Sequence, residues 1–91
     1  ILTNMAQSNE LQAVVISPER TLYHANVEAL IVPGEKGQFE ILRNHAPLIS
    51  SLTAGTIICR GNEPFEIHII SGFVEVKDNE VTLCVEVDNS L

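Results

Sequence analysis

The chain has 91 residues, a formal net charge of −7 and 45 % hydrophobic residues. This length fits one small domain, and no apolar run approaches the roughly 20 residues of a membrane-spanning helix, which predicts no direct membrane insertion. Nucleic acid is not an expected partner, because phosphate binding requires clustered Lys and Arg, and the 5 basic residues are scattered. The excess of acidic residues favours a partner protein with a basic surface instead.

Short strand patterns alternate with turn signals along most of the chain. Residues 1–10 are polar and aperiodic, and we expect them to form a flexible tail. The expected strands, bounded mostly by Pro, Gly, Asn, Asp or Ser, are 11–17, 21–24, 27–32, 38–42, 48–52, 56–60, 65–70, 73–77 and 81–87. No helix of useful length is indicated. The spacing of the turns predicts an all-β, antiparallel β-sandwich of about 8–10 short strands. It spans residues 11–88, with residues 89–91 as a C-terminal tail.

Some apolar residues exceed what one core requires. The expected strand 27–32 is apolar on both faces, and Ile58, Ile70 and Phe73 share the phase of polar neighbours. A sandwich needs only one apolar face per sheet, so surplus apolar positions indicate a partner surface. Incidental exposure of single apolar residues is the alternative.

No group of residues has the pattern of a catalytic or metal site. His24, His45 and His68 lack the spacing of metal ligands, and no serine stands in a nucleophile elbow. Gly34 and Gly37 frame a turn that is too short to cradle a phosphate. The sequence therefore predicts no catalytic residues, no metal, no cofactor and no enzyme activity. His45 is either a contact residue on an exposed loop or a ring that bonds backbone to hold its turn.

Two cysteines, Cys59 and Cys84, lie in strand-like runs without metal-site or redox-motif spacing. We expect both to be reduced, buried thiols of a cytosolic protein. A disulfide remains an alternative if the two strands face each other, since spacing alone does not decide pairing.

A series of short motifs carries a family resemblance. In chain order they are Ser17-Pro18-Glu19, Pro33-Gly34, Gly37-Gln38-Phe39, His45-Ala46-Pro47-Leu48, Leu52 to Gly55, and Gly72-Phe73-Val74-Glu75-Val76. In this order and spacing the chain resembles, from residue 11 to 87, the N-terminal β-sandwich of the epsilon subunit of F-type ATP synthases, called delta in mitochondria. Glu40 departs from the usual glycine, and Arg43-Asn44 replaces a common Pro-Gly. These departures are expected to soften the turn before His45 and to reshape the loop.

The resemblance implies a rotor subunit of the central stalk, which couples proton flow through the c ring to the catalytic subunits and is not itself an enzyme. It implies contacts with the gamma subunit at Ser17, His45 and Phe73. It implies contacts with the c-subunit ring at Glu35, Lys36, Gly37 and Gln38. The implied location is peripheral, on the cytoplasmic face of a bacterial inner membrane or on the matrix or stromal face of an organelle.

Two further alternatives remain. A free-standing β-sandwich that binds a small ligand or carbohydrate is the rival function, but the chain has no Trp, 1 Tyr and 3 Phe, which is poor material for an aromatic binding platform. Family members usually continue into a helical hairpin, whereas this chain ends at Leu91. A natural short form and a truncated chain are both consistent with that ending.

Overall fold

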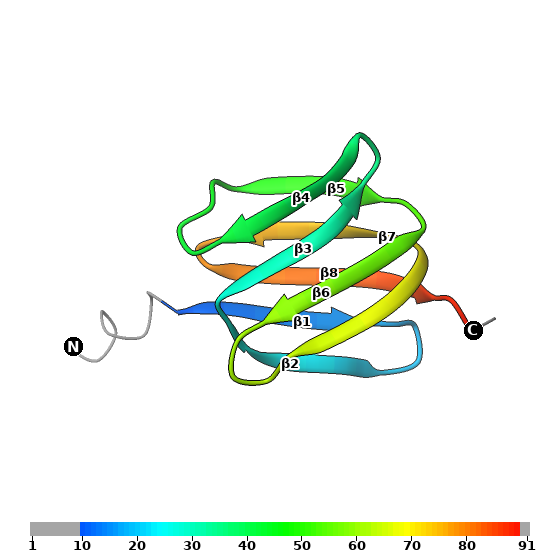
Figure 1. The fold of residues 1–91 in the computed structure, drawn as a ribbon, viewed down its shortest axis with the longest axis horizontal. Coiled ribbons are helices and arrows are strands. Elements are labelled where there is room, and N and C mark those ends of the chain that lie inside the picture. Colours follow the sequence, from blue (N-terminus) through cyan, green and yellow to red (C-terminus); the bar gives the residue numbers. More distant parts are fainter. Residues whose placement is uncertain (1–9, 90–91) are drawn as a thin grey trace.

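Eight β-strands make up the fold, seen in a computed structural model that describes residues 10–89 (Figure 1). They are β1 (Leu11–Ile16), β2 (Thr21–Val27), β3 (Ala29–Gly34), β4 (Gly37–Leu42), β5 (Leu48–Leu52), β6 (Gly55–Arg60), β7 (Phe65–Lys77) and β8 (Glu80–Val87). No helix occurs between residues 10 and 89. The predicted all-β sandwich is confirmed. Of the expected tails, residues 1–9 and 90–91 lie outside the described residues.

The strands form two layers that cross one another. Layer A has the order β2-β1-β8-β7-β5, and layer B joins β4, β3, β6 and the first half of β7. In Figure 1, β3, β4 and β6 run diagonally across β1, β7 and β8. All pairings are antiparallel except that of β1 with β8, which is parallel. Side chains alternate between the two faces in parallel and in antiparallel strands alike, so the sequence pattern did not indicate that β1 and β8 run parallel.

One long strand belongs to both layers. We expected Ser71-Gly72 to end a strand, but β7 continues through both residues, and its register against β8 shifts between Ile69 and Ser71. This bulge bends the strand, so that the first half pairs with β6 and the second half with β5. A Cβ at Gly72 would lie 2.5 Å from the backbone oxygen of Cys84, so glycine is required for this close approach.

Two other strand ends differ from expectation. β2 continues to Val27, and β3 includes Pro33 and Gly34 rather than ending before them. Gly34 pairs with Gly37, which leaves a two-residue connection between β3 and β4. The carbonyl of Pro33 accepts a hydrogen bond from the Thr53 N–H at 2.9 Å. Proline is tolerated here because its carbonyl still takes part in strand-end bonding although it has no N–H to donate.

The core lies between the inner faces of the two layers. Residues 81–87 alternate between two sets, which predicts that Val81, Leu83, Val85 and Val87 face inward. The first three are buried, and Val87 packs against the core but stays partly exposed. Cys59 is 1 % exposed and belongs to this core, whereas Cys84 pairs with Phe73 on the outer face of layer A. Both cysteines are free. The disulfide alternative is therefore wrong, because Cys59 faces the core and Cys84 faces the outer groove.

Candidate docking surface

An open groove of about 740 Å³ lies on the outer face of layer A. The strand register sets its floor: Ile16 pairs with Cys84, and Cys84 pairs with Phe73, so the three side chains share one face. Phe73 is 49 % exposed. Ser17 lines the same groove, which we call the Phe73 groove. Two of the three gamma-contact residues implied by the resemblance therefore lie together.

The turn from Ser17 to Arg20 closes one end of this groove. The backbone N–H of Ser17 donates to the carbonyl oxygen of Arg20 at 2.9 Å, and the backbone N–H of Arg20 donates to the Ser17 hydroxyl oxygen at 3.3 Å. Pro18 at the second position has its φ angle restricted by the ring. These bonds hold the rim of the groove in one conformation.

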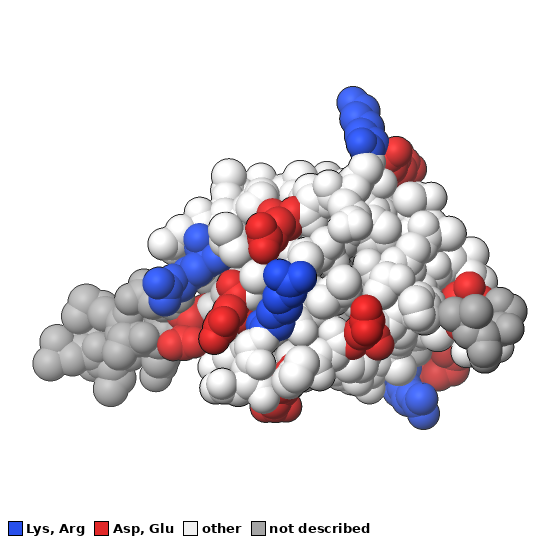
Figure 2. All heavy atoms as spheres, viewed as in Figure 1, with Lys and Arg blue, Asp and Glu red and all other residues white. Residues whose placement is uncertain are grey.

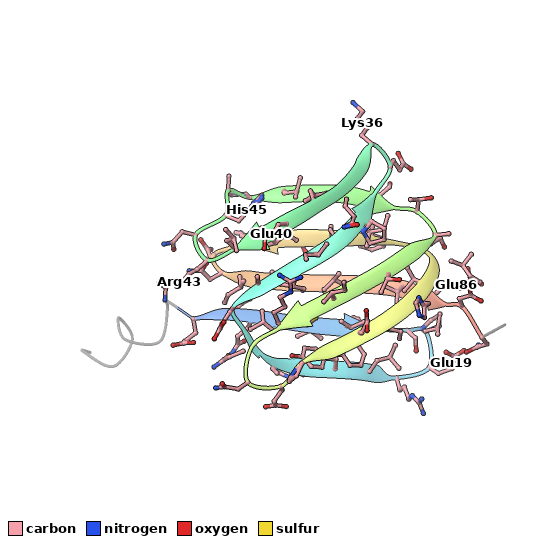
Figure 3. The ribbon with its side chains drawn as sticks, viewed as in Figure 1. Glu19, Lys36, Glu40, Arg43, His45 and Glu86 are labelled. Carbon is pink, nitrogen blue, oxygen red and sulfur yellow. The ribbon has the colours of Figure 1, made fainter. Side chains whose placement is uncertain are left out.

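Two carboxylates stand on the rim of the Phe73 groove. A carboxylate oxygen of Glu19 accepts from the Ser17 hydroxyl at 3.3 Å, and one of Glu86 lies 3.5 Å from the Ser71 hydroxyl. Figure 3 shows both carboxylates at the same end of the molecule. No Lys or Arg is among the described residues that line the groove. An apolar floor with an acidic rim is complementary to an apolar side chain with basic neighbours.

His45 lies at the opposite end of the molecule from Glu19 (Figure 3). Its backbone N–H donates to the Leu42 carbonyl at 3.1 Å, and its ring Nδ1 lies 2.9 Å from the carbonyl oxygen of Ala46. The ring is therefore within hydrogen-bond distance of the backbone of its own turn. The structure does not bring His45 into the groove with Ser17 and Phe73, so a gamma contact at His45 stays a prediction.

The loop before His45 keeps a tight turn although its sequence departs from the expected Pro-Gly. Asn44 has a φ of 67°, in the left-handed region where glycine is usual and asparagine is the best-tolerated alternative. Its backbone N–H donates to Oδ1 of Asn79 at 2.6 Å, and Nδ2 of Asn79 donates to Oδ1 of Asn44 at 3.2 Å. The turn is therefore supported rather than softened.

The four expected c-ring residues form the tip of the β3–β4 hairpin and are all exposed: Glu35, Lys36, Gly37 and Gln38. Gly37 has a φ of 123°, a value that L side chains rarely adopt. Lys36 projects from the tip in Figure 3, away from Glu19 and Glu86. Figure 2 shows a basic and an acidic side chain next to each other there, and scattered charges of both signs over the layer B face.

Sequence reasoning missed one exposed residue on this face. Ile49 is 75 % exposed, and it lies diagonally across from Phe73, because Ser51 pairs with Phe73 and Ile49 is two positions from Ser51. Both side chains therefore contribute to the outer face of layer A. The signal was available, because Ile49 is out of phase with the inward-facing Leu52.

The described residues hold no other site with recognisable chemistry. Between residues 10 and 89, no group of three or more His, Cys, Asp and Glu side chains could hold a metal ion. The ring Nδ1 of His68 lies 2.8 Å from the hydroxyl of Thr56 on the neighbouring strand. No helix long and apolar enough to cross a membrane occurs among residues 10–89.

Comparison with known proteins identifies the family of this β-sandwich domain. Residues 10–87 match the family described as "ATP synthase, Delta/Epsilon chain, beta-sandwich domain". The ATP synthase epsilon chain of Leptospira interrogans is 44 % identical over 80 residues, which are 87 % of this chain and 63 % of that protein. The epsilon chain of Synechococcus elongatus is 42 % identical over 72 residues, 78 % of this chain and 53 % of the other.

A solved structure with this fold is that of the Euglena gracilis mitochondrial ATP synthase, in an assembly of OSCP, F1 and c-ring. One of its chains aligns with a TM-score of 0.76 and 17 % identity, covering 85 % of this chain and 51 % of that one.

The fold is that of a β-sandwich domain with an open groove on its outer face. The chain belongs to the ATP synthase delta/epsilon β-sandwich family. It spans 63 % of the length of the Leptospira relative and 53 % of the length of the Synechococcus one.

Proposed function

We propose that this domain is part of the central-stalk rotor of an F-type ATP synthase. It binds the gamma subunit and the c-subunit ring and so helps couple proton flow to the catalytic subunits, without catalytic residues of its own. Family membership supports the assignment to this complex. The observation that carries the docking proposal is that folding brings Ser17 and Phe73 together in one groove. The domain then lies peripherally, on the cytoplasmic face of a bacterial inner membrane or the equivalent organellar face.

The gamma subunit occupies the Phe73 groove in this proposal, with a further contact at His45. Its inserted segment carries an apolar side chain for the floor and basic side chains for the rim at Glu19 and Glu86. Burying the exposed half of Phe73 stabilises such a complex by about 1–2 kcal/mol from apolar area and aromatic contact. The acidic rim speeds encounter with a basic partner and makes it sensitive to salt.

The c ring takes the separate β3–β4 tip, with contacts at Glu35, Lys36, Gly37 and Gln38. The tip and the groove lie at different places on the surface, so both partners can bind at once. The charged tip can contact polar loops at the end of a membrane-embedded ring, because Glu35 and Lys36 remain hydrated in such a contact.

The direct test is co-purification with the gamma subunit and the detergent-solubilised c ring from the same source. Retention of both partners is expected. A chain that retains neither partner, although it is folded, would refute the rotor assignment and favour the free-standing binding module.

A thiol-labelling experiment locates the gamma contact. Cys84 lines the Phe73 groove and is a free, half-buried thiol. Cys59 is buried in the core, which raises the pKa of its thiol to about 11. A thiol reagent at about pH 8 therefore labels Cys84 first. Bound gamma subunit should slow this labelling, and unchanged labelling in a saturated complex would exclude the groove as the contact.

A further inference from the structure

Two asparagines that are 35 positions apart bind each other beside His45. The backbone N–H of Asn44 can only donate, so the atom of Asn79 that faces it is the acceptor Oδ1, at 2.6 Å. The other end of the same amide, Nδ2, then donates to Oδ1 of Asn44 at 3.2 Å. We call these two bonds the Asn44–Asn79 clasp. It ties the loop 43–47 to the β7–β8 turn.

The β7–β8 turn is itself anchored. Asn79 is 9 % exposed and is the one polar residue that is buried among residues 10–89. Its φ is 63°, and that of Asp78 is 52°, as a tight type I′ hairpin turn requires. The carbonyl oxygen of Asn79 accepts from the Gln12 N–H on β1 at 2.9 Å. The clasp therefore connects the loop 43–47 to a turn that is itself bonded to β1 in layer A.

We propose that Asn79 is a positioning residue for the docking loop 43–47, which it holds in the binding conformation before the partner arrives. The docking half of this inference rests on the proposed gamma contact at His45. A loop that is already ordered loses less conformational entropy on binding, so the clasp raises affinity without touching the partner. It also replaces, through a side chain from elsewhere in the chain, the local rigidity that a Pro-Gly pair would supply.

The turn offers a graded set of variants with a matched control. Asn79→Gly removes both bonds of the clasp and keeps the backbone conformation, because glycine adopts the left-handed conformation readily. Asn79→Asp keeps the oxygen that accepts from the Asn44 N–H and removes the Nδ2 donor. Asn44→Gly also removes only the second bond. Asp78→Gly makes the same kind of change in the same turn, at an exposed side chain outside the clasp.

Two measurements test the clasp, one for its effect on the order of the loop and one for its effect on gamma binding. The first is hydrogen exchange of the Asn44 amide in the isolated chain, where Asn79→Gly should accelerate exchange by about tenfold or more, because a part-buried donor loses its acceptor. The second is the dissociation constant for the purified gamma subunit from the same source, which should rise about tenfold for Asn79→Gly. Asn79→Asp and Asn44→Gly should lie between wild type and Asn79→Gly, and Asp78→Gly should match wild type in both measurements.

A double-mutant cycle separates positioning from general destabilisation. If Asn79 acts through the docking loop, Asn79→Gly should weaken gamma binding in the wild-type background and should add little in a His45→Ala background. A merely structural role would weaken both backgrounds equally, and that result would overturn the proposal. So would equal gamma affinity for Asn79→Gly and Asp78→Gly. If wild type does not bind gamma, the docking half fails with the proposed function. Hydrogen exchange still tests whether the clasp orders the loop. That role is refuted if the Asn44 amide exchanges equally fast in wild type and in Asn79→Gly.

Discussion

Replacing Phe73 by glutamate is the sharpest test of the groove, because the change should damage binding far more than folding. Phe73 is 49 % exposed, so about half of its side chain contributes to stability. Losing that half costs about 1 kcal/mol of unfolding free energy, which lowers the melting temperature of a domain of this size by about 4–8 °C. The domain should therefore remain folded.

The effect on gamma binding should be larger. Phe73→Glu removes the aromatic part of the apolar floor and adds a third carboxylate to the groove that Glu19 and Glu86 already line. A charge placed against an apolar or like-charged surface costs several kcal/mol, and about 1.4 kcal/mol corresponds to a factor of ten in affinity. We therefore expect the dissociation constant for gamma to rise by at least about 100-fold.

The assay pairs calorimetric titration of gamma with thermal melting, and it has a matched control. Ile58 is half-buried on layer B, where it pairs with Ile31, and it belongs neither to the Phe73 groove nor to the loop 43–47. Ile58→Glu should lower the melting temperature by a similar amount and leave the gamma affinity within about threefold of wild type. Normal binding by Phe73→Glu, or an equal loss by Ile58→Glu, would show that the groove is not the gamma contact.

Three other perturbations test His45, the β3–β4 tip and the buried Cys59. His45→Glu should weaken gamma binding by about tenfold while costing under about 0.5 kcal/mol of stability, as measured by titration and melting; unaltered affinity would remove His45 from the contact. Lys36→Glu should weaken capture by the detergent-solubilised c ring and leave gamma binding intact, and loss of both would point to misfolding at the tip. Burial raises the pKa of Cys59 from 9.0 to about 11, so the folded chain holds this proton more tightly than the unfolded chain. The contribution of the neutral, buried Cys59 thiol to the free energy of unfolding should be fully present below pH 9 and should be lost as the pH rises toward 11. The denaturant midpoint should therefore fall with pH across this range, and Cys59→Ala should make that fall less steep. Burial also raises the pKa of Tyr23, which acts in the same direction, so some slope should remain.

The sequence indicated several local features of this surface, although it suggested a softened turn before His45 and missed the exposed Ile49. The two-residue period of β8 identified its buried face, and the Gly34–Gly37 frame identified the hairpin tip. Phe73 was singled out because it shares the phase of Glu75 and Lys77, and its exposure confirms that reasoning. These are signals between near neighbours, which the alternation of side chains and the needs of tight turns impose on any strand.

Tertiary structure alone decided which distant residues meet. The floor of the Phe73 groove exists because β1 runs parallel to β8, which places Ile16 beside Cys84. The Asn44–Asn79 clasp exists because the loop 43–47 lies over the β7–β8 turn. A single sequence specifies the faces of each strand, but several strand orders, and register shifts of two residues, keep the same faces buried. Strand order and register are selected only when the whole core packs, and the groove and the clasp are consequences of that choice.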